Sequence, residues 1–302
     1  MASTEEALPL LKRDLSTCKR VGRSCIVVTA LLVVTTGVYV CYLWRSHGGV
    51  VVASSGDFKQ ALGTFGEYDA NAPARITSSV LKDAGGAGHD GYLAVIANAA
   101  PHFHIEGSCT SVAKTSATAK EAGCRYAVNG GPFNSWLSGG CIGPTISHGR
   151  VLNEDWNTSY ASFGLTSKGE WVVGHFASKA ILGSNIVEGM TGFGWLVRNG
   201  RSVAPSDDQK AERTAIGVNR QGDLMLLQVD GCERCPFSGG ASGLTLQELA
   251  KLLVSKDAVN AINLDGGGSS TTVENGEVKN RPDCLELGIE CERSVTSVVC
   301  IS

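Results

Sequence analysis

The chain has 302 residues, of which 43% are hydrophobic and 18% are charged, and its formal net charge is −3. This length and composition are typical of a globular protein with a substantial core, which excludes an intrinsically disordered chain. Acidic residues outnumber basic ones by 29 to 26, so the chain offers no basic face and no nucleic-acid partner is expected.

The first 44 residues predict a membrane anchor. Cys25 to Trp44 is an uncharged run of 20 residues, long enough at about 1.5 Å per residue to cross roughly 30 Å of hydrocarbon. Five basic residues precede it and only Arg45 follows closely, so the positive-inside rule places the N-terminus in the cytoplasm. A signal peptide cleaved near Ala53 is the alternative, but its apolar region would be shorter. We therefore expect an uncleaved signal anchor over residues 25–44.

Two short segments flank this span. Residues 1–24 form the predicted cytoplasmic tail, in which Glu6, Leu10 and Leu11 resemble the acidic dileucine signals that clathrin adaptors read. So short a pattern fits an ordinary apolar patch equally well. Residues 45–56 are the predicted linker, because Gly48 to Gly56 is small and polar enough for a short tether. The remaining residues, 57–302, are expected to form one domain in the lumen of the Golgi or endosomes, or outside the cell.

Cysteine usage agrees with this topology. Eight of the 11 cysteines follow the predicted span, and an even number in an oxidising compartment predicts disulfides. Zinc is the alternative for Cys232 and Cys235, but no second pair of ligands stands at zinc-finger distance. Asn157 begins the Asn-Thr-Ser sequon, which predicts a glycosylated surface. The eight cysteines are Cys109, Cys124, Cys141, Cys232, Cys235, Cys284, Cys291 and Cys300.

Short apolar runs separated by Gly and Asn turns predict strands along the domain. Two helices interrupt them. Thr245 and Glu248 form a capping box ahead of a helix over residues 246–255, and a helix over 111–122 ends at Gly123. Without a regular alternation of strand and helix, the pattern favours an α+β domain of mixed, twisted sheets flanked by a few helices. The predicted strands are residues 91–97, 125–129, 161–165, 171–174, 193–197, 214–218, 224–229, 261–264 and 295–300.

Three segments place polar side chains at strand ends. Asn129 follows one strand and precedes a glycine pair, Arg213 begins another, and Asp265 ends a third before three consecutive glycines. Residues without a Cβ let backbone N–H groups crowd around an anion or a sugar. Taken singly, each segment is an ordinary turn or strand end. The triplet is not a nucleotide P-loop, because no Gly-Lys-Ser/Thr ending follows.

Taken together, these segments resemble the phosphodiester glycosidase family. The resemblance rests on Asn-Gly-Gly-Pro-Phe at 129–133, Arg-Thr-Ala-Ile-Gly at 213–217 and Asn-Leu-Asp-Gly-Gly-Gly-Ser at 263–269. Order and spacing also agree in the segments between them, so the resemblance covers about residues 91–300.

The resemblance implies hydrolysis of the bond between a sugar's anomeric carbon and a phosphodiester oxygen. In the family's best-known reaction, N-acetylglucosamine is removed from GlcNAc-1-phospho-6-mannose groups to expose mannose 6-phosphate, so we expect a glycan or glycoprotein substrate. Cys232 and Cys235 are left to pair with each other or to stay reduced. The implied disulfides are Cys109–Cys141, Cys124–Cys300 and Cys284–Cys291.

The chemistry of this bond suggests roles for the polar residues. A phosphomonoester is a good leaving group, so charge stabilisation matters more than proton donation. Asp265 is predicted to attack the anomeric carbon or to activate water, and Arg213 to bind the phosphate, helped by glycine N–H groups. Asn129 is predicted to orient the sugar or the phosphate. The predicted substrate-binding residues are Gly130, Gly131, Thr214, Gly266, Gly267, Gly268 and Ser269.

Other candidates are weaker. Glu106 is a second carboxylate, for which a turn residue is an equal alternative. His102 and His104 alternate on one strand but lack a third ligand, so neither a metal nor a cofactor is expected. Two rival functions remain: an inert, membrane-tethered glycan-binding protein on the same domain, and a glycosidase for a different sugar phosphodiester. The retained polar residues at the strand ends favour an enzyme.

Overall fold

The computed structural model describes residues 51–52, 69–134, 140–156, 158–176, 185–235 and 240–302. The predicted tail with Glu6, Leu10 and Leu11, the span 25–44, most of the linker and the sequon residue Asn157 lie outside these ranges. Within them, none of the helices has the length and apolar character that crossing a bilayer demands.

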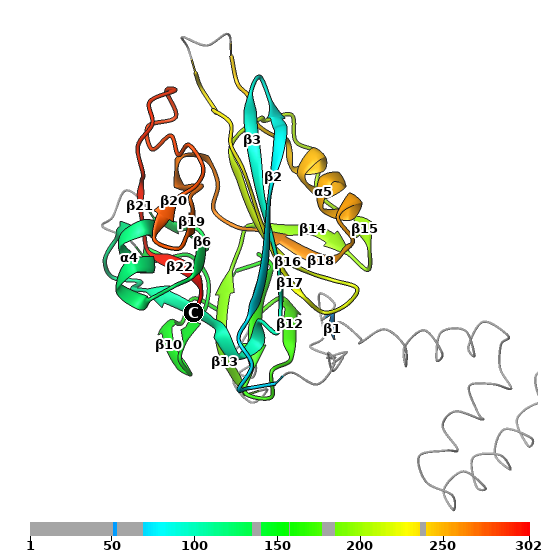
Figure 1. The fold of residues 1–302 in the computed structure, drawn as a ribbon, viewed down its shortest axis with the longest axis vertical. Helices are drawn as coiled ribbons and strands as arrows, with labels where there is room; N and C mark the ends of the chain where they lie inside the picture. The colour runs from blue at the N-terminus through cyan, green and yellow to red at the C-terminus, as the bar shows by residue number, and fades with distance from the viewer. Residues whose placement is uncertain (1–50, 53–68, 135–139, 157, 177–184, 236–239) are drawn as a thin grey trace, which may run out of the picture. The chain divides into compact units, whose positions relative to one another are not determined.

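The largest sheet has seven strands in the order β15-β14-β18-β16-β17-β3-β2, with antiparallel neighbours throughout. Its central strands are apolar on both faces: in β17, Leu226 faces the main core and Leu227 packs with helix α5 (Leu246–Ser255). Figure 1 shows α5 beside β14, β15 and β18. The strands are β2 (Arg75–Gly86), β3 (His89–Ala97), β14 (Gly194–Arg198), β15 (Arg201–Ser202), β16 (Arg213–Asn219), β17 (Leu224–Val229) and β18 (Ala258–Asn263).

A six-stranded sheet has the order β1-β12-β11-β13-β9-β10. Its neighbours are antiparallel except for the parallel pair β1 and β12. Its strands are β1 (Val51–Val52), β9 (Thr145–Ser147), β10 (Arg150–Asn153), β11 (Ser162–Thr166), β12 (Trp171–Gly174) and β13 (Ile186–Thr191).

A five-stranded antiparallel sheet has the order β20-β19-β6-β22-β4. Helix α4 (Thr115–Ala122) packs on it through Ala119, which joins Ala127 and Val298 in one buried cluster. Gly123 ends α4 in the left-handed conformation, at φ 70°, which glycine adopts without strain. The strands are β4 (Phe103–Gly107), β6 (Tyr126–Asn129), β19 (Thr272–Glu274), β20 (Glu277–Val278) and β22 (Ser297–Ile301).

Four shorter strands and two 3₁₀ turns complete the described elements. Strand β5 pairs with β21, and β7 pairs with β8. Their bounds are β5 (Ala113–Lys114), β21 (Ser294–Val295), β7 (Phe133–Asn134), β8 (Gly140–Cys141), η1 (Ala100–His102) and η3 (Gly267–Ser269).

The main core lies where the three larger sheets meet. Phe103 on β4 contacts Trp171 on β12 edge to face, with ring centroids 5.1 Å apart, and Phe163 on β11 lies 6.1 Å from Phe103. Ile216 and Leu226 of the seven-stranded sheet belong to the same buried cluster. Such aromatic contacts add to the burial energy, so this core fixes the sheets that carry the candidate site.

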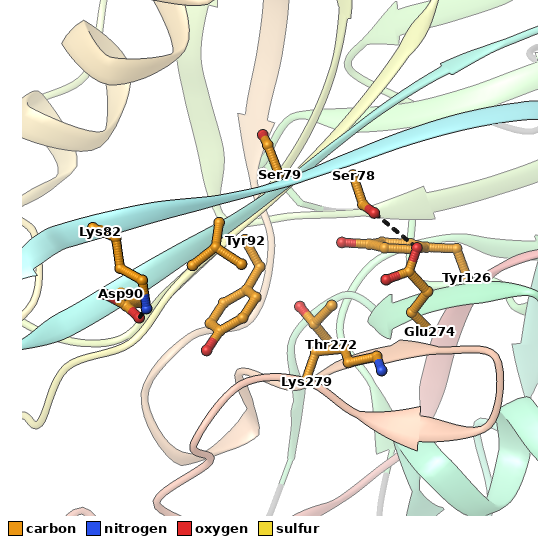
Figure 2. Close-up of a pocket in the computed structure, with 10 residues that line it drawn as sticks. Ser78, Ser79, Lys82, Asp90, Tyr92, Tyr126, Thr272, Glu274 and Lys279 are labelled. Atoms are coloured by element: carbon orange, nitrogen blue, oxygen red, sulfur yellow. Dashed lines mark hydrogen bonds and ion pairs between the residues drawn. The ribbon is translucent and has the colours of Figure 1, made fainter.

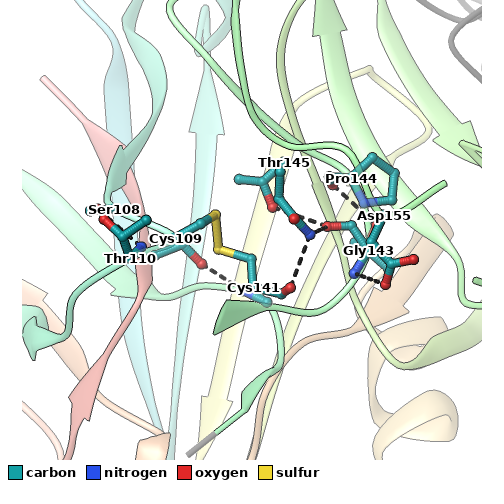
Figure 3. The surroundings of a disulfide bond; sticks show 12 residues. Ser108, Cys109, Thr110, Cys141, Gly143, Pro144, Thr145 and Asp155 are labelled. Atoms are coloured by element: carbon teal, nitrogen blue, oxygen red, sulfur yellow. Dashed lines mark hydrogen bonds between the residues drawn. A yellow bond between two sulfur atoms is a disulfide. The ribbon is translucent and has the colours of Figure 1, made fainter. Parts of the chain in front are cut away.

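Among the described residues, four disulfides close loops around this core. The three pairs implied by the family resemblance are formed, and Cys232 pairs with Cys235, which settles the alternative left open by the sequence. Cys109–Cys141 joins the segment after β4 to β8 and lies close to Gly143 and Thr145 (Figure 3). The bonded pairs are Cys109–Cys141, Cys124–Cys300, Cys232–Cys235 and Cys284–Cys291.

The predicted elements are largely confirmed. Every predicted strand range overlaps an observed strand, and the strand 224–229 and the helix 246–255 match in both bounds. The sheets, with two α-helices among the described residues, agree with the α+β prediction. The helix predicted over 111–122 begins only at Thr115, because Ala113 and Lys114 pair with β21. Strand β2 was missed because most of its residues are exposed and show no apolar alternation.

Candidate active site

The three segments singled out in the sequence meet at the side-chain amide of Asn129. Asn129 ends β6 and is completely buried. Its Oδ1 accepts hydrogen bonds from the Thr214 hydroxyl at 2.8 Å and from the Thr271 N–H at 3.2 Å. Its Nδ2 donates to the carbonyl oxygen of Asp265 at 2.8 Å. One amide therefore joins the end of β6, the start of β16 and the turn after β18.

Backbone hydrogen bonds complete this junction. The N–H of Leu264 donates to the carbonyl of Thr214 at 2.8 Å, and the N–H of Asp265 donates to the carbonyl of Gly130 at 3.1 Å. The N–H of Gly267 donates to the carbonyl of Glu212 at 2.9 Å. The backbone of residue 265 is thus held from both neighbouring strands, which fixes the direction of its side chain.

The Asp265 carboxyl lies in a half-buried position at this junction. Burial raises its pKa to about 6, although the Ser269 hydroxyl, the charge of Arg293 and the N–H of Gly266 act in the opposite direction. The Ser269 hydroxyl is buried and makes no other hydrogen bond among the described residues. A carboxylate with a pKa near 6 is ionised at neutral pH and is more basic than an ordinary aspartate.

A second perturbed carboxyl, Glu212, lies beside the same turn. Its side chain is 1% exposed, and neither carboxylate oxygen has a hydrogen-bond partner. Burial raises its pKa to about 7, and the charges of Asp283 and Glu286 add to the effect. A Cβ on Gly266 would lie 2.8 Å from the Glu212 carbonyl, so the glycine permits this close packing. Two titratable groups with shifted pKa values thus share one junction.

An arginine and a carboxylate cover the glycine triplet. Oε1 of Glu286 accepts a hydrogen bond from Nη2 of Arg293 at 2.8 Å and from the N–H of Gly268 at 3.4 Å. Arg293 also donates to the carbonyl of Cys284, at the start of the loop that Cys284 and Cys291 close. Burial alone would raise the pKa of Glu286, but Arg293 more than offsets it and the pKa is lowered. The Arg293 guanidinium and the Gly268 N–H therefore form a pair of donors suited to an anion, and the Glu286 carboxylate binds to both.

A separate cavity of ≈ 300 Å³ lies between strands β2–β3 and β19–β20 (Figure 2). Its polar contacts include the Ser78–Glu274 hydrogen bond at 2.8 Å and the Lys82–Asp90 ion pair at 2.7 Å. Asp265 is not among its lining residues. We therefore place the candidate chemistry at the junction and not in this cavity.

Comparison with known proteins decides the family. The family model described as phosphodiester glycosidase matches residues 122–302, which is more than half of the chain. The chain belongs to the phosphodiester glycosidase family. Asp265, Glu212 and Arg293 all lie in the matched region, whereas Glu106 lies outside it.

The bovine and human relatives of this phosphodiester glycosidase carry the same name. The N-acetylglucosamine-1-phosphodiester alpha-N-acetylglucosaminidase of Bos taurus is 35% identical over 220 residues, covering 65% of this chain and 40% of the bovine protein. The Homo sapiens protein of that name is 36% identical over 206 residues, covering 61% of this chain and 39% of the human protein. The chain thus spans about 40% of the length of these relatives.

A solved structure supports the same fold. The catalytic domain of the zebrafish enzyme of that name, described as auto-inhibited by its pro-peptide, superposes with a TM-score of 0.66 at 25% identity, covering 79% of this chain and 86% of that one. A hypothetical protein from Synechocystis superposes with a TM-score of 0.51 at 15% identity, covering 76% of this chain and 62% of that one, and shows the fold alone.

Arg213, predicted to bind the phosphate, makes its described hydrogen bonds within the protein. Its Nε donates to the carbonyl of Leu244 at 2.9 Å, and its Nη2 donates to Asp207 at 3.0 Å and to the carbonyl of Gln209 at 2.6 Å. These contacts commit the guanidinium to the protein, so any phosphate contact would have to use Nη1. Burial lowers the pKa of Arg213, and the Asp207 charge counteracts this.

The glycines next to Asn129 also differ from their predicted role. The N–H of Gly130 donates to the Ser297 carbonyl at 2.8 Å, and that of Gly131 to the Ser297 hydroxyl at 3.2 Å. A Cβ on Gly131 would lie 2.1 Å from the Thr191 carbonyl. These glycines permit close packing, and their N–H groups are bonded to Ser297.

Three further residues that were predicted to bind the substrate make hydrogen bonds within the protein. Thr214 is completely buried, and its hydroxyl bonds Asn129, so it supports the site without facing a ligand. The N–H of Gly267 donates to the backbone carbonyl of Glu212, and the N–H of Gly268 donates to the side-chain carboxylate of Glu286. The N–H of Gly267 is therefore held by the backbone, whereas the N–H of Gly268 is held only by the side chain of Glu286.

Glu106 and the two histidines lie in separate environments, with His102 in η1 and His104 and Glu106 on β4. Glu106 accepts a hydrogen bond from Nε2 of His148 at 3.0 Å, which pairs it with that residue. Nε2 of His102 contacts the Ala72 carbonyl at 2.9 Å. His104 instead stacks on His148, with ring centroids 5.0 Å apart.

The sequence did not identify Glu212, Glu286 or Arg293. Glu212 stands before Arg213 in the motif, but only its burial reveals its altered pKa. Glu286 and Arg293 belong to the loop closed by Cys284 and Cys291, so their charges inside a short disulfide loop were the available signal.

We predict that Asn129→Ala destabilises the chain by about 3 kcal/mol, because it removes the acceptor of the buried Thr271 N–H, the donor to the Asp265 carbonyl and one of the two partners of the Thr214 hydroxyl. Denaturant unfolding of the full chain measures the loss. Asn153→Ala, which removes donors to two carbonyls at a half-buried position, is the matched control, expected to cost about 1 kcal/mol. Equal losses of unfolding free energy in the two variants would show that the hydrogen bonds of Asn129 do not stabilise the junction more than ordinary half-buried ones.

We predict that Glu212 makes the chain less stable as the pH rises. The folded state keeps the proton up to a pKa of about 7, whereas the unfolded state loses it near 4.5, so stability falls between these values by about 3 kcal/mol. Glu212→Gln should remove that fall when unfolding is measured from pH 4 to 8. Glu170→Gln is the control. An unchanged pH dependence in Glu212→Gln would refute the assigned burial.

Proposed function

We propose that this chain hydrolyses sugar 1-phosphodiesters, with Asp265 as the reacting carboxylate. Family membership supports the reaction class, and the bovine and human relatives are named for the removal of alpha-N-acetylglucosamine from a 1-phosphodiester. The proposed substrate is therefore GlcNAc-1-phospho-6-mannose on a glycan or glycoprotein, and the product exposes mannose 6-phosphate.

The position of Asp265 is the observation that carries the proposal. Its backbone is held by Asn129 and Gly130, and its carboxyl, with a pKa of about 6, lies under the influence of the Arg293 charge. A fixed, ionised carboxylate beside a cation suits a reaction in which positive charge develops at a sugar carbon and negative charge at a phosphate.

The reaction proceeds by cleavage of the bond between C1 of the sugar and the phosphate oxygen. The bonding electrons leave with that oxygen, and Arg293 stabilises the resulting phosphomonoester charge. Asp265 either bonds to C1, forming a glycosyl ester that water then hydrolyses, or takes a proton from the water that attacks C1. In both routes the water oxygen ends on the sugar.

Arg293 is the proposed phosphate ligand in place of Arg213. Arg293 is 30% exposed and already holds a carboxylate, Glu286, together with the N–H of Gly268. An anionic substrate that reaches these donors shares them with Glu286 or displaces it. Arg213 is 11% exposed and bonded to three protein acceptors, so it is less available.

The proposed location is the lumenal side of a membrane, behind a signal anchor at residues 25–44. The uncharged run of 20 residues supports the anchor, and the four disulfides support an oxidising compartment such as the Golgi or endosomal lumen. Clathrin adaptors reading Glu6, Leu10 and Leu11 in the tail are part of this proposal.

The activity of the full chain, purified in detergent, tests the function on GlcNAc-1-phospho-6-mannose and on related sugar phosphodiesters. Asp265→Asn and Arg293→Ala should each lower kcat/KM by about 100-fold, because each removes charge that stabilises the transition state. Arg220→Ala, at an exposed position, is the matched control and should be near wild type.

The outcomes separate the rival functions. Sugar binding without turnover on the whole panel would replace the enzyme by a glycan-binding protein. Turnover of another sugar alone would change the substrate and keep the reaction class. Wild-type rates in Asp265→Asn would remove Asp265 from the mechanism.

We predict a bell-shaped dependence of kcat/KM on pH. Activity should rise as Asp265 ionises near pH 6 and fall as Glu212 ionises near pH 7, since a charged Glu212 repels the phosphate. Glu212→Gln keeps a neutral donor and should lose the fall while keeping the rise. An alkaline fall that persists in Glu212→Gln would show that Glu212 has no part in it.

A further inference from the structure

A second cluster of ligand-type side chains lies apart in sequence from the residues proposed for catalysis. His104 comes from β4, His148 from the turn between β9 and β10, and Glu188 from β13. One ligand atom from each of the three lies within 4.8 Å of the others. The three line a cavity of ≈ 230 Å³. The fold thus brings together two imidazoles and a carboxylate from three separate elements.

The spacing of these atoms fits a metal better than direct hydrogen bonds. Nδ1 of His104 and Nδ1 of His148 each lie 3.6 Å from Oε1 of Glu188, which is too long for a good hydrogen bond. Ligands bound to Zn²⁺ at about 2.0–2.1 Å in a tetrahedron lie roughly 3.3 Å from one another. The observed separations are close to this edge length.

The carboxylate is oriented by the backbone. Oε2 of Glu188 accepts a hydrogen bond from the Ile105 N–H at 2.9 Å, and Oε1 accepts one from the His148 N–H at 2.9 Å. The side chain of Glu188 is 5% exposed. A buried carboxylate held at both oxygens, with one oxygen directed at two imidazoles, is a built ligand and not a flexible surface acid.

Glu106 completes the arrangement around His148. Its Oε1 contacts Nε2 of His148 at 3.0 Å, and a carboxylate in this position fixes the tautomer that leaves Nδ1 as a free acceptor. His148 itself has φ 48°, an uncommon conformation for a residue with a Cβ. Residues in such conformations cluster at ligand-binding sites.

The Nδ1 atom of His104 supplies independent evidence. This atom is buried and has no hydrogen-bond partner, an arrangement that costs free energy unless something unseen satisfies the nitrogen. The nitrogen lies on the side of the ring that faces Glu188. A cation between the two would satisfy both.

We propose that His104, His148 and Glu188 bind a divalent transition-metal ion, for which Zn²⁺ is the probe. Two imidazoles and one carboxylate form a donor set that suits Zn²⁺, with a fourth position open toward the cavity. Glu106 is a positioning residue that acts through His148. The ion would tie β4 of the five-stranded sheet to β13 and the β9–β10 turn of the six-stranded sheet.

Zn²⁺ binding to the full chain, first treated with a chelator and dialysed, tests the site by calorimetry. One ion per chain is expected. His104→Ala and His148→Ala should each abolish this binding, and Glu106→Gln should weaken it by about 10-fold or more, as loss of a carboxylate that orients a ligating histidine does. His102→Ala is the matched control, because His102 lies two residues from His104 and contacts Ala72 instead.

Co²⁺ provides a second readout that a folding defect would not imitate. The intense visible absorption of tetrahedral Co²⁺ should appear in the wild type and in His102→Ala, and should be absent in His148→Ala that retains its circular dichroism. No Zn²⁺ binding by the wild type, or equal binding by His102→Ala and His148→Ala, would overturn the proposal. Neither readout depends on glycosidase activity, so the site and the proposed function fail separately.

Discussion

The buried side-chain amide of Asn129 is the interaction on which the candidate active site depends. It accepts from Thr214 and Thr271 and donates to the carbonyl of Asp265, so three strand ends from distant parts of the chain share one group. Each bond is made in the interior, where an unsatisfied partner costs more than the bond itself contributes. The direction of the Asp265 carboxyl follows from this junction.

Burial also sets the electrostatics of the site. Asp265 and Glu212 have raised pKa values chiefly because the fold removes them from water, and the Arg293 charge limits the shift at Asp265. As a result, Asp265 is ionised at neutral pH, whereas Glu212 titrates close to neutral pH. A site for an anionic substrate needs this balance, because too many ionised carboxylates would exclude the phosphate.

Sequence patterns predicted the strands and the convergence of the motifs, but not the partners of individual side chains. Residues 224–229 are apolar except for Gln228 and are all buried in a central strand, which made this strand predictable from the sequence. Arg213 shows the limit: its place in the motif suggested a phosphate ligand, yet its bonds to Asp207 and Leu244 depend on loops that no local pattern defines. The pairing of His104 with His148 joins residues 44 positions apart and was invisible for the same reason.

A crystal structure of the full-length Asp265→Asn chain with GlcNAc-1-phospho-6-mannose bound tests the proposed site most directly. We expect the phosphate oxygens on the Arg293 guanidinium, with the anomeric carbon facing residue 265. A ligand seated in the cavity lined by Tyr92 and Glu274, or a phosphate bound to Arg213 with residue 265 making no contact, would contradict it.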